Sequence, residues 1–457
     1  MRPVALSQVA HWCEGRLLGD DATIASVTTD SRGVAGDRAL FVALRGENFD
    51  AHEFAAQAVA NGAIAALVSR PVEADVPQIL CADTQEALGE FAAGMQHGRP
   101  AVVVALTGSN GKTSVKTLVH GILSRAGRCY VNPGNFNNEI GLPLAVLAAP
   151  EDAQFAVYEM GAGKPGDIAY LASIAPPQVA LVNNIAPAHL ERMGTLLGVA
   201  ETKGAIYEAL PDDGVGVVNA DDAFAPYFMD RLSGRRVFRF GIENDADVHA
   251  EQIVGDGDGS RFRLRTPAGI ETIDLPLPGR HNVMNALAAA ALALGAGAPF
   301  TAIVEGLRHA EPVKGRQVPH RLRNGAVLVD DSYNANPGSV AAAIAALAQA
   351  GGEAWLVLGN MAELGEGAED LHAGVGHQAR TAGIARLWTH GALAAHASRA
   401  FGDGGRHFAD QAALAQALRA ELRNGVRCLV KGSRSSAMDK VVRAVLDADG
   451  EGTGHAS

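Results

Sequence analysis

Apolar residues recur along the chain in short runs that are separated by longer amphipathic segments. The run AVVVAL at residues 101–106 is apolar without interruption, which is the pattern of a strand buried on both faces of a sheet. Helical segments and further apolar runs at 155–159, 179–182 and 214–218 follow it. Strands that alternate with helices predict a parallel sheet of βαβ units, and therefore an α/β fold.

The pattern divides the chain into three blocks, and we expect one α/β domain from each. Residues 1–98 mix short strands and helices, which predicts a small N-terminal domain. Residues 99–310 contain the parallel sheet, an antiparallel insert at 248–273 and a long helix after it. Residues 311–457 alternate strands and helices again, which is typical of a Rossmann-like domain, and their polar end from 447 is predicted to fray. Outside the middle block, the expected strands are 39–44, 64–68, 326–329, 354–358, 386–389 and 427–430, and the expected helices are 53–60, 85–96, 339–349, 370–382, 411–423 and 436–446.

Composition and charge restrict the class of protein. The 457 residues include 38 Lys and Arg against 50 Asp and Glu, and a net charge of -12 argues against a nucleic-acid partner. A hydrophobic content of 48% excludes a mostly disordered chain. The apolar runs are too short for a membrane span, which needs about 18 residues. Four scattered cysteines are typical of free thiols in a reducing cytosol, so we expect a cytoplasmic, monomeric protein without membrane insertion.

The strongest local motif is TGSNGKTS at residues 107–114, which joins the buried strand to a helix predicted at 114–125. Glycines let backbone N–H groups face phosphate oxygens, and the helix N-terminus adds partial positive charge. Lys112 would contact the β- and γ-phosphates, and the Thr113 hydroxyl would bind Mg²⁺. The strict pattern GxxxxGK[ST] needs a glycine where this chain has Leu106, so a glycine-rich turn with an incidental lysine is the alternative. The motif predicts a P-loop, ATPase-like central domain.

The loop resembles that of the Mur ligases and folylpolyglutamate synthetases, which form amide bonds from ATP, a carboxylate and an amine. The strings DSYNANP at 331–337, LGNMAELG at 358–365 and KGSRS at 431–435 are similar to those of the Mur ligase that uses UDP-N-acetylmuramoyl-tripeptide and D-alanyl-D-alanine. The Asp-Asn-Pro-Arg motif of the preceding, diamino-acid-adding ligase is absent. The resemblance covers all three blocks and implies, in order, a UDP-sugar-binding, an ATP-binding and an amine-binding domain.

The resemblance implies carboxylate activation by ATP, through an acyl phosphate that the amine then attacks. It implies nucleotide contacts from the phosphate loop, from the long helix and from two residues of the third block. These residues are Gly108, Ser109, Asn110, Gly111, Lys112, Thr113, Ser114, Asn282, Asn285, Arg316 and Asp331. Asn282 and Asn285 share a helix face, where their amides would suit an adenine edge, and helix capping by Asn282 is the alternative.

The resemblance also implies ligands for two Mg²⁺ ions. Glu159, at the end of an apolar strand, would bind one ion with Thr113, and His189 would bind the second. The lysine that matches Lys203 is carbamylated in the family, which would give an anion for the second ion and requires burial that lowers the lysine pKa. The alternatives are an ordinary strand-end acid, a loop histidine without a role and a solvated lysine. The implied catalytic set is Lys112, His189, Lys203 and Arg316.

Substrate contacts are implied in all three blocks. The residues that match the family's uridine-diphosphate strings are Ser31, Arg32, Arg45, Gly46 and His52, and the alternative is that they only support turns of their own domain. Asn138 would lie where the nucleotide peptide meets ATP. The residues expected near the dipeptide are Asn334, Asn336, Glu363, Arg434 and Ser435. Lys431 would neutralise substrate charge or hold the Gly432 turn, and Lys116 is assigned no role.

Two other functions share the phosphate loop. One is folylpolyglutamate synthetase or another Mur ligase, against which the first block and the DSYNANP string argue. The other is a non-catalytic nucleotide switch or ATPase, which would hydrolyse ATP without an amine acceptor.

Overall fold

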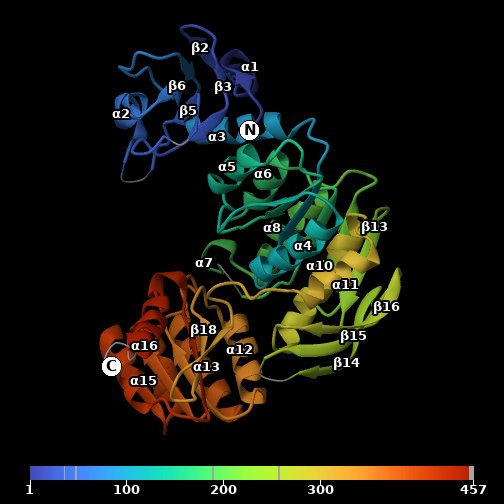
Figure 1. Cartoon of the computed structure of the whole chain (residues 1–457), viewed down its shortest axis with the longest axis vertical. Helices are drawn as coiled ribbons and strands as arrows, with labels where there is room; N and C mark the ends of the chain where they lie inside the picture. Colours follow the sequence, from blue (N-terminus) through green and yellow to red (C-terminus); the bar gives the residue numbers. More distant parts are fainter. Residues whose placement is uncertain (35, 47–48, 188–189, 256–257, 452–457) are drawn as a thin grey trace, which may run out of the picture.

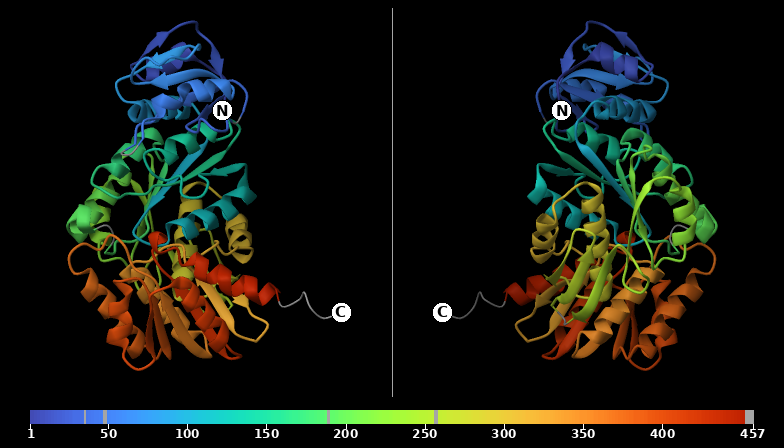
Figure 2. Two further views of the ribbon diagram at one scale, coloured as in Figure 1. Left: turned by 90° about the vertical axis from the view of Figure 1, so that its left-hand side faces the viewer. Right: turned by 90° about the vertical axis from the view of Figure 1, so that its right-hand side faces the viewer.

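A computed structural model describes residues 1–34, 36–46, 49–187, 190–255 and 258–451. The chain forms three α/β units, with the N-terminal unit at one end, the C-terminal unit at the other and the middle unit between them (Figure 1, Figure 2). Each unit has its own sheet, so the predicted three-domain α/β architecture is confirmed. No helix among the described residues is long and apolar enough to cross a membrane.

The N-terminal unit is a small five-stranded sheet with helices, as predicted. The strand order is β2-β7-β6-β5-β4, and only β2 runs antiparallel to its neighbour. The strands are β2 Arg16–Leu18, β4 Ser26–Thr28, β5 Ala39–Val42, β6 Ala63–Val68 and β7 Gln78–Leu80, with the pair β1 Val4–Ala5 and β3 Thr23–Ile24 beside them. The helices are α1 Leu6–Trp12, η1 Ala51–Phe54, α2 Ala55–Ala60 and α3 Thr84–Gln96.

The middle unit is built on a nine-stranded sheet in the order β16-β15-β14-β13-β12-β11-β8-β10-β9. The strands are β8 Val102–Thr107, β9 Cys129–Val131, β10 Phe155–Glu159, β11 Val179–Val182, β12 Val215–Asn219, β13 Arg236–Gly241, β14 Val248–Gly255, β15 Ser260–Thr266 and β16 Gly269–Leu275. The helices are α4 Lys112–Ala126, α5 Gly141–Ala148, α6 Asp167–Ile174, α7 Leu190–Met193, α8 Leu196–Glu208, α9 Ala225–Arg231, α10 Arg280–Gly295 and α11 Phe300–Arg308.

The structure refines the prediction for the 248–273 segment. Its strands pair antiparallel, as expected, but β14 also runs parallel to β13, so the segment continues the main sheet. The prediction lacked β13, whose sequence RVFRFG carries two arginines, and β9, which is only three residues long. Both faces of β8 are buried as predicted, because Val103 and Ala105 join one apolar cluster and Val104 and Leu106 join another.

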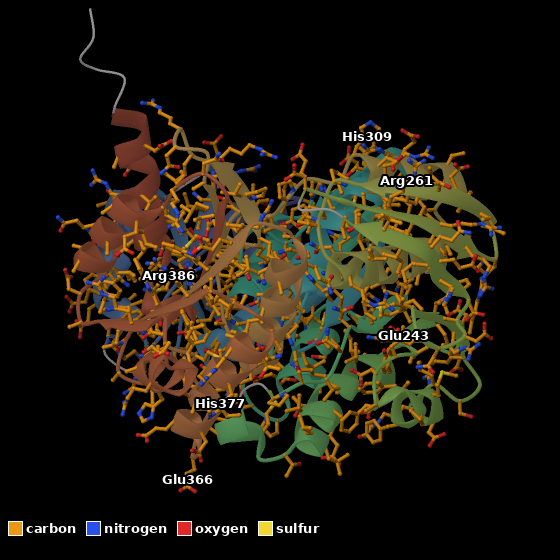
Figure 3. The ribbon with its side chains drawn as sticks, turned by 90° about the horizontal axis from the view of Figure 1, so that it is seen from below. Glu243, Arg261, His309, Glu366, His377 and Arg386 are labelled. Atoms are coloured by element: carbon orange, nitrogen blue, oxygen red, sulfur yellow. The ribbon has the colours of Figure 1, made fainter. Side chains whose placement is uncertain are left out.

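The C-terminal unit has a Rossmann-like sheet in the order β17-β18-β22-β19-β20-β21, with β17 as the antiparallel edge. The strands are β17 Val318–Arg321, β18 Val327–Asp331, β19 Glu353–Leu358, β20 Arg386–His390, β21 Gly405–Phe408 and β22 Val426–Lys431. The helices are α12 Pro337–Gln349, α13 Ala368–Thr381, α14 Ala394–Phe401, α15 Gln411–Glu421, η2 Arg434–Ser436 and α16 Asp439–Glu451. The prediction lacked α14 and β21. Seen from below, this unit lies beside the middle unit, with Arg386 labelled on the former and Glu243 on the latter (Figure 3).

The predicted fraying from residue 447 is wrong as far as residue 451, because α16 continues to Glu451. The Asp449 carboxylate accepts a hydrogen bond from the Arg323 backbone N–H at 3.2 Å. The Arg323 guanidinium donates to the Gly450 carbonyl at 3.2 Å. These contacts hold the polar end of the helix against the loop after β17.

Candidate active site

The phosphate loop lies at the carboxyl end of β8, where the order of the middle sheet reverses between β10 and β11. Helix α4 begins at Lys112, two residues earlier than predicted, and Gly111 is its left-handed N-cap with φ of 79°. A Cβ atom at Gly111 would lie 2.5 Å from Asn285 Oδ1, so a side chain does not fit there. The N-terminal N–H groups of α4 are therefore presented at the loop, as phosphate binding requires.

Two asparagines that follow β11 support the phosphate loop. The Asn110 backbone N–H donates to Asn184 Oδ1 at 2.8 Å, and Asn183 Nδ2 donates to the Asn110 carbonyl at 2.9 Å. The Ser109 N–H donates to the Asn184 carbonyl at 3.0 Å. The Lys112 ammonium donates to the Gly108 carbonyl at 2.7 Å, and burial lowers its pKa. The loop is thus rigid and carries a cation, which suits phosphate binding.

Glu159 ends β10 next to the loop and is 3% exposed. Its Oε1 atom accepts a hydrogen bond from Asn137 Nδ2 at 2.8 Å, whereas its buried Oε2 atom has no hydrogen-bond donor among the described residues. Lys116 Nζ lies 3.5 Å from Oε2. A buried carboxylate oxygen that has no hydrogen-bond donor among the described residues and lies beside the phosphate loop fits a Mg²⁺ ligand.

Lys116 is a site residue that the sequence did not reveal. Its ammonium donates to the carbonyls of Asn132 and Gly134 at 2.9 and 3.0 Å and forms the ion pair with Glu159. It lies four residues after Lys112 and therefore on the same side of α4. That spacing was the available signal, but the partner 43 residues further on could not be read from it.

Lys203 lies on α8, which packs against β8 and β11, and is only 1% exposed. The solvated-lysine alternative is therefore wrong. Burial and, to a smaller extent, the nearby Lys112 charge together lower the pKa of Lys203 to about 7. A lysine with this pKa is partly neutral near pH 7, which meets the chemical requirement for carbamylation. His189, the other implied ligand of a second ion, lies outside the described residues.

The C-terminal unit contributes two side chains to the phosphate loop. Arg316 Nη2 donates to Thr113 Oγ1 at 3.1 Å, and Arg316 Nε is buried with no hydrogen-bond partner among the described residues. Asn336 Nδ2 donates to Asn110 Oδ1 at 2.8 Å. Asn336 also caps α12, where it accepts from the Ser339 N–H at 2.8 Å. Asn336 therefore joins the two units at the loop, a contact that the sequence did not predict.

The asparagines of α10 have different surroundings. Asn285 Oδ1 faces the phosphate loop at Gly111, and Asn282 Nδ2 donates to the Pro278 carbonyl at 2.8 Å. The N-cap of α10 is Gly279, so the capping alternative for Asn282 is wrong. Asn282 lines a cavity of about 90 Å³ together with Ser114 and Arg316. An adenine contact from Asn282 stays a prediction that this cavity accommodates.

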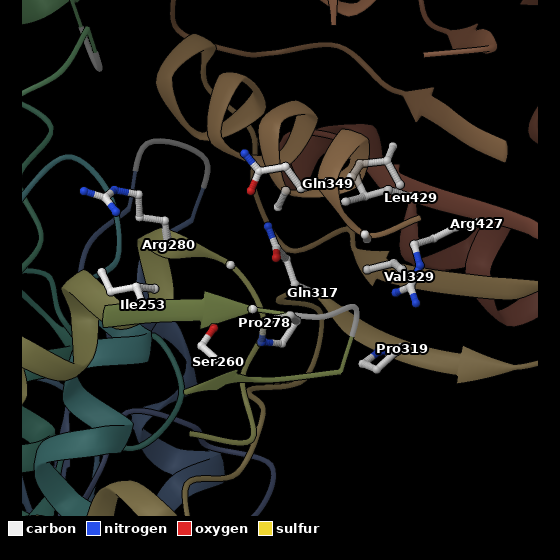
Figure 4. A pocket seen from close by; sticks show the side chains of 15 residues that line it. Ile253, Ser260, Pro278, Arg280, Gln317, Pro319, Val329, Gln349, Arg427 and Leu429 are labelled. Atoms are coloured by element: carbon white, nitrogen blue, oxygen red, sulfur yellow. The ribbon is translucent and has the colours of Figure 1, made fainter. Parts of the chain in front are cut away.

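A larger cavity of about 260 Å³ lies beside it, between β14, β15, the start of α10 and α12 (Figure 4). Pro278, Gln317 and Pro319 line both cavities. Figure 4 shows the Gln317 side chain near the centre, with Arg280 on the side of the middle unit. The two cavities form one crevice between the middle and C-terminal units.

Asp331 ends β18 and forms a buried ion pair with Lys431 at the end of β22. Lys431 Nζ donates to Asp331 Oδ2 at 2.8 Å and to the Asn334 carbonyl at 2.9 Å. Lys431 therefore holds Asp331 and the start of the DSYNANP loop, a role that neither sequence interpretation included. Burial lowers the pKa of His281, and the charges of Asp331 and Lys431 act on it across the unit boundary.

The loop that carries Glu363 is held by a buried histidine. His372 Nε2 accepts from the Met361 N–H at 2.9 Å, and its Nδ1 atom lies 2.6 Å from the Ala368 carbonyl oxygen. Burial lowers the pKa of His372, consistent with a neutral ring that donates at Nδ1 and accepts at Nε2. Glu363 itself has a left-handed backbone with φ of 59°. His372 was not identified from the sequence pattern.

Three sequence families match parts of this chain, in the same order as its three units. They are described as "Mur ligase family, catalytic domain" for residues 23–96, "Mur ligase middle domain" for 106–293 and "Mur ligase, glutamate ligase domain" for 315–434. The UDP-N-acetylmuramoyl-tripeptide–D-alanyl-D-alanine ligase of Escherichia coli (strain K12) is 46% identical over 450 residues, which cover 98% of this chain and 99% of that protein. The chain belongs to the Mur ligase family.

Solved structures of Mur ligases have the same fold. A crystal structure of MurF from Acinetobacter baumannii matches with a TM-score of 0.92 and 34% identity, over 98% of this chain and 99% of that one. The MurF ligase of Thermotoga maritima, crystallised with ADP, matches with a TM-score of 0.85 and 27% identity, over 94% of this chain and 98% of that one. The similarity thus extends through all three units.

In this Mur ligase, two of the implied uridine-diphosphate contacts are engaged within their own unit. Ser31 Oγ donates to Gln57 Oε1 at 3.0 Å. The buried His52 ring has Nδ1 2.5 Å from Asp50 Oδ1, and its Nε2 accepts from the Ser69 N–H at 2.8 Å. Both side chains therefore stabilise the loops, as the alternative stated, and a direct contact with substrate stays a prediction.

The exposed loop residues of the same unit are better placed for a ligand. Arg32 and Arg45 are exposed, and hydrogen bonds from Arg32 lower the pKa of Asp30 to about 2. At Gly46 a Cβ atom would lie 2.6 Å from the exposed Phe49 ring, so a side chain there would displace that ring. Two exposed arginines on adjacent loops suit a diphosphate.

The remaining predicted substrate contacts lie around the DSYNANP loop and at the start of α5. Asn334, Arg434 and Ser435 are exposed, whereas Asn138 Oδ1 accepts from the Gly141 N–H at 2.8 Å and so supports the start of α5. Direct substrate contacts of these four side chains stay predictions.

Proposed function

We propose that this chain is an ATP-dependent ligase that joins D-alanyl-D-alanine to UDP-N-acetylmuramoyl-tripeptide in the synthesis of peptidoglycan precursors. The observation that carries the proposal is the contact of Arg316 with Thr113. This contact places a cation from the C-terminal unit at the phosphate loop of the middle unit. The crevice between the same two units supports a nucleotide held by both. The full-length identity to the E. coli ligase supports the choice of substrates.

The reaction has two steps that involve one carboxyl group. A carboxylate oxygen of the tripeptide attacks the γ-phosphorus, the bond to the ADP oxygen breaks, and an acyl phosphate and ADP result. The neutral amine of the dipeptide then attacks the carbonyl carbon and loses one proton to solvent. The bond between that carbon and the phosphate oxygen breaks, and inorganic phosphate leaves. Lys112 and Arg316 neutralise the negative charge that gathers on the transferred group, while the rigid loop positions it.

The proposed metal ligands are Thr113 and Glu159 for one Mg²⁺, and His189 with carbamylated Lys203 for a second. Mg²⁺ bound there would neutralise phosphate oxygens during transfer. The buried Glu159 Oε2, which pairs with Lys116 but accepts no hydrogen bond among the described residues, supports the first site. The buried Lys203 amine supports the second site, because a neutral amine reacts with CO2.

We further propose domain boundaries at 98/99 and 310/311, with UDP-sugar binding in the first domain and amine binding in the third. The boundaries lie in the links between α3 and β8 and between α11 and β17. A cytoplasmic, monomeric enzyme fits the free thiols among the described residues and a phosphate site built from one chain.

The test is phosphate release from ATP in the presence of the nucleotide tripeptide, with and without D-alanyl-D-alanine. A ligase releases phosphate only when the dipeptide is present, and mass spectrometry then finds the nucleotide pentapeptide. Equal turnover without the dipeptide indicates an ATPase or nucleotide switch instead.

Arg434→Ala is expected to raise the KM for D-alanyl-D-alanine by about tenfold or more, with a smaller change in the KM for ATP. The reason is the loss of a charge-assisted hydrogen bond to the dipeptide carboxylate. Steady-state kinetics with each substrate varied separately measures both constants. Arg443→Ala is the control, because Arg443 is also exposed and forms a local ion pair with Asp439. An unchanged dipeptide KM removes Arg434 from the amine site.

A further inference from the structure

Tyr333 in the DSYNANP loop lies close to both of the arginines that are assigned to different substrates. The Arg316 Cζ atom lies 4.4 Å from the centroid of the Tyr333 ring, and the Arg434 Cζ atom lies 5.4 Å from it. The Tyr333 backbone N–H donates to the Gly315 carbonyl at 3.1 Å. One residue thus contacts the phosphate-side arginine, the dipeptide-side arginine and the link between the two units.

The two contacts are of a kind that fixes a flexible cation. An aromatic face attracts a guanidinium within about 6 Å of its centroid, most strongly where water is excluded. Two arginines that share a small region repel each other, and contact of both with one uncharged π surface offsets part of that repulsion. Immobilising a long side chain before the ligand arrives also removes part of the entropic cost of binding.

The ring is itself held in place. Besides the bond to Gly315, the loop is fixed at its start by the Asp331–Lys431 ion pair and by the bond from Lys431 to the Asn334 carbonyl. The backbone on both sides of Tyr333 therefore has fixed partners. A ring on a fixed backbone can orient the arginines, whereas a ring on a loose loop would follow them.

We propose that Tyr333 is a positioning residue that orients Arg316 toward the transferred phosphate and Arg434 toward the dipeptide carboxylate, and so couples the two subsites. The proposal rests on the proposed function for the identity of the two substrates. It implies that the aromatic face, and not the hydroxyl, carries the effect. It also implies that a nucleotide that engages Arg316 tightens the binding of the dipeptide.

The test compares Tyr333→Phe with Tyr333→Leu. Loss of the ring is expected to lower kcat and raise the dipeptide KM, each by roughly five- to thirty-fold, because both cation–π contacts are lost. The Phe variant is expected to stay within about threefold of wild type in both constants, since it keeps the ring. Tyr227→Leu is the matched control, because the Arg231 Cζ atom lies 4.7 Å from the centroid of the Tyr227 ring and both residues lie on α9 of the middle unit.

Binding measurements add a readout that a purely structural role would not move. In wild type, a non-hydrolysable ATP analogue is expected to tighten D-alanyl-D-alanine binding, measured by calorimetry with the nucleotide tripeptide present. Tyr333→Leu is expected to remove this coupling while each ligand still binds alone. Wild-type coupling in the Leu variant, or equal defects in the Phe and Leu variants, overturns the proposal.

Tyr333→His keeps the proposal testable if the Leu variant folds poorly. Its imidazole is a smaller aromatic ring, and the two neighbouring guanidinium charges favour its neutral form. The dipeptide KM of this variant at pH 8 is expected to lie above the values of wild type and of Tyr333→Phe, because the smaller ring offers less aromatic face to the two arginines. A dipeptide KM equal to that of wild type overturns the proposal. If wild type shows no dipeptide-dependent turnover, the proposed function fails, and binding of the ATP analogue to the Tyr333 variants still tests the Arg316 contact.

Discussion

Lys203→Ala is expected to lower turnover by roughly 10²-fold or more, because it removes the group proposed to become an anion at the second metal site. The substitution removes a side chain that is 1% exposed, so a lowered melting temperature is also expected. Phosphate release at saturating substrate concentrations measures the loss, and binding of ADP shows whether the phosphate loop remains intact. Lys440→Ala is the control, because Lys440 is exposed on α16.

Addition of short carboxylates to Lys203→Ala tests whether the modified lysine acts as an anion. Formate or acetate at millimolar concentration fits the space left by the side chain and supplies the missing negative charge, so partial recovery of Lys203→Ala is expected. Lys203→Arg is not expected to be active, since a guanidinium does not take up CO2 in this way. Wild-type turnover in Lys203→Ala rejects the carbamate role.

The pH dependence follows from the lowered pKa of Lys203. Burial brings this pKa from its ordinary value of 10.5 to about 7, so the neutral amine becomes the main form of unmodified enzyme above about pH 7. At a fixed, low concentration of dissolved CO2, activation is therefore expected to increase as the pH rises through 7. Between pH 7 and 10.5 the unfolded chain keeps the proton that the folded unmodified chain has lost, so the stability of the unmodified fold rises with pH in that window.

The parts of the structure that could be predicted from sequence are those encoded by neighbouring residues. The run AVVVAL followed by TGSNGKTS contains the buried strand β8, the loop and the start of α4, and it places Lys112 and Thr113 without knowledge of the rest. Alternating strands and helices likewise predict the Rossmann-like third unit. Strands β9 and β13 were not predicted because their hydrophobic patterns are weak. Strand β9 has only three residues, and β13 contains two arginines.

The parts that escaped prediction depend on which segments become neighbours. Asp331 and Lys431 each end an apolar strand, but they pair because β18 lies directly beside β22 with these two residues in register. The sequence of one strand does not show which other strand will lie beside it in a parallel sheet. The same limit applies to Asn336, whose position before Pro337 predicts a helix cap, whereas its contact with Asn110 exists only once two units meet.

Arg316→Met is expected to lower turnover by about a hundredfold or more while the affinity for ADP changes little. Arg316 reaches Thr113 from the C-terminal unit, so its charge acts where the transferred phosphate gathers negative charge, and removal of such a cation costs roughly 10²–10³-fold or more in rate. ADP lacks that phosphate. Single-turnover phosphate release measures the rate, and calorimetry with ADP and with a non-hydrolysable ATP analogue separates the two contributions.

The matched control is Arg321→Met. Arg321 also lies on the C-terminal unit and contacts the middle unit, through Asp258 at 2.6 Å, but this exposed pair contributes little because water screens it. Near wild-type turnover is expected for it. If Arg316→Met weakens ADP as much as the ATP analogue, Arg316 acts by holding the two units together and not by stabilising the phosphate. If only the analogue and the rate are affected, catalysis requires the cation that the third domain brings to the loop.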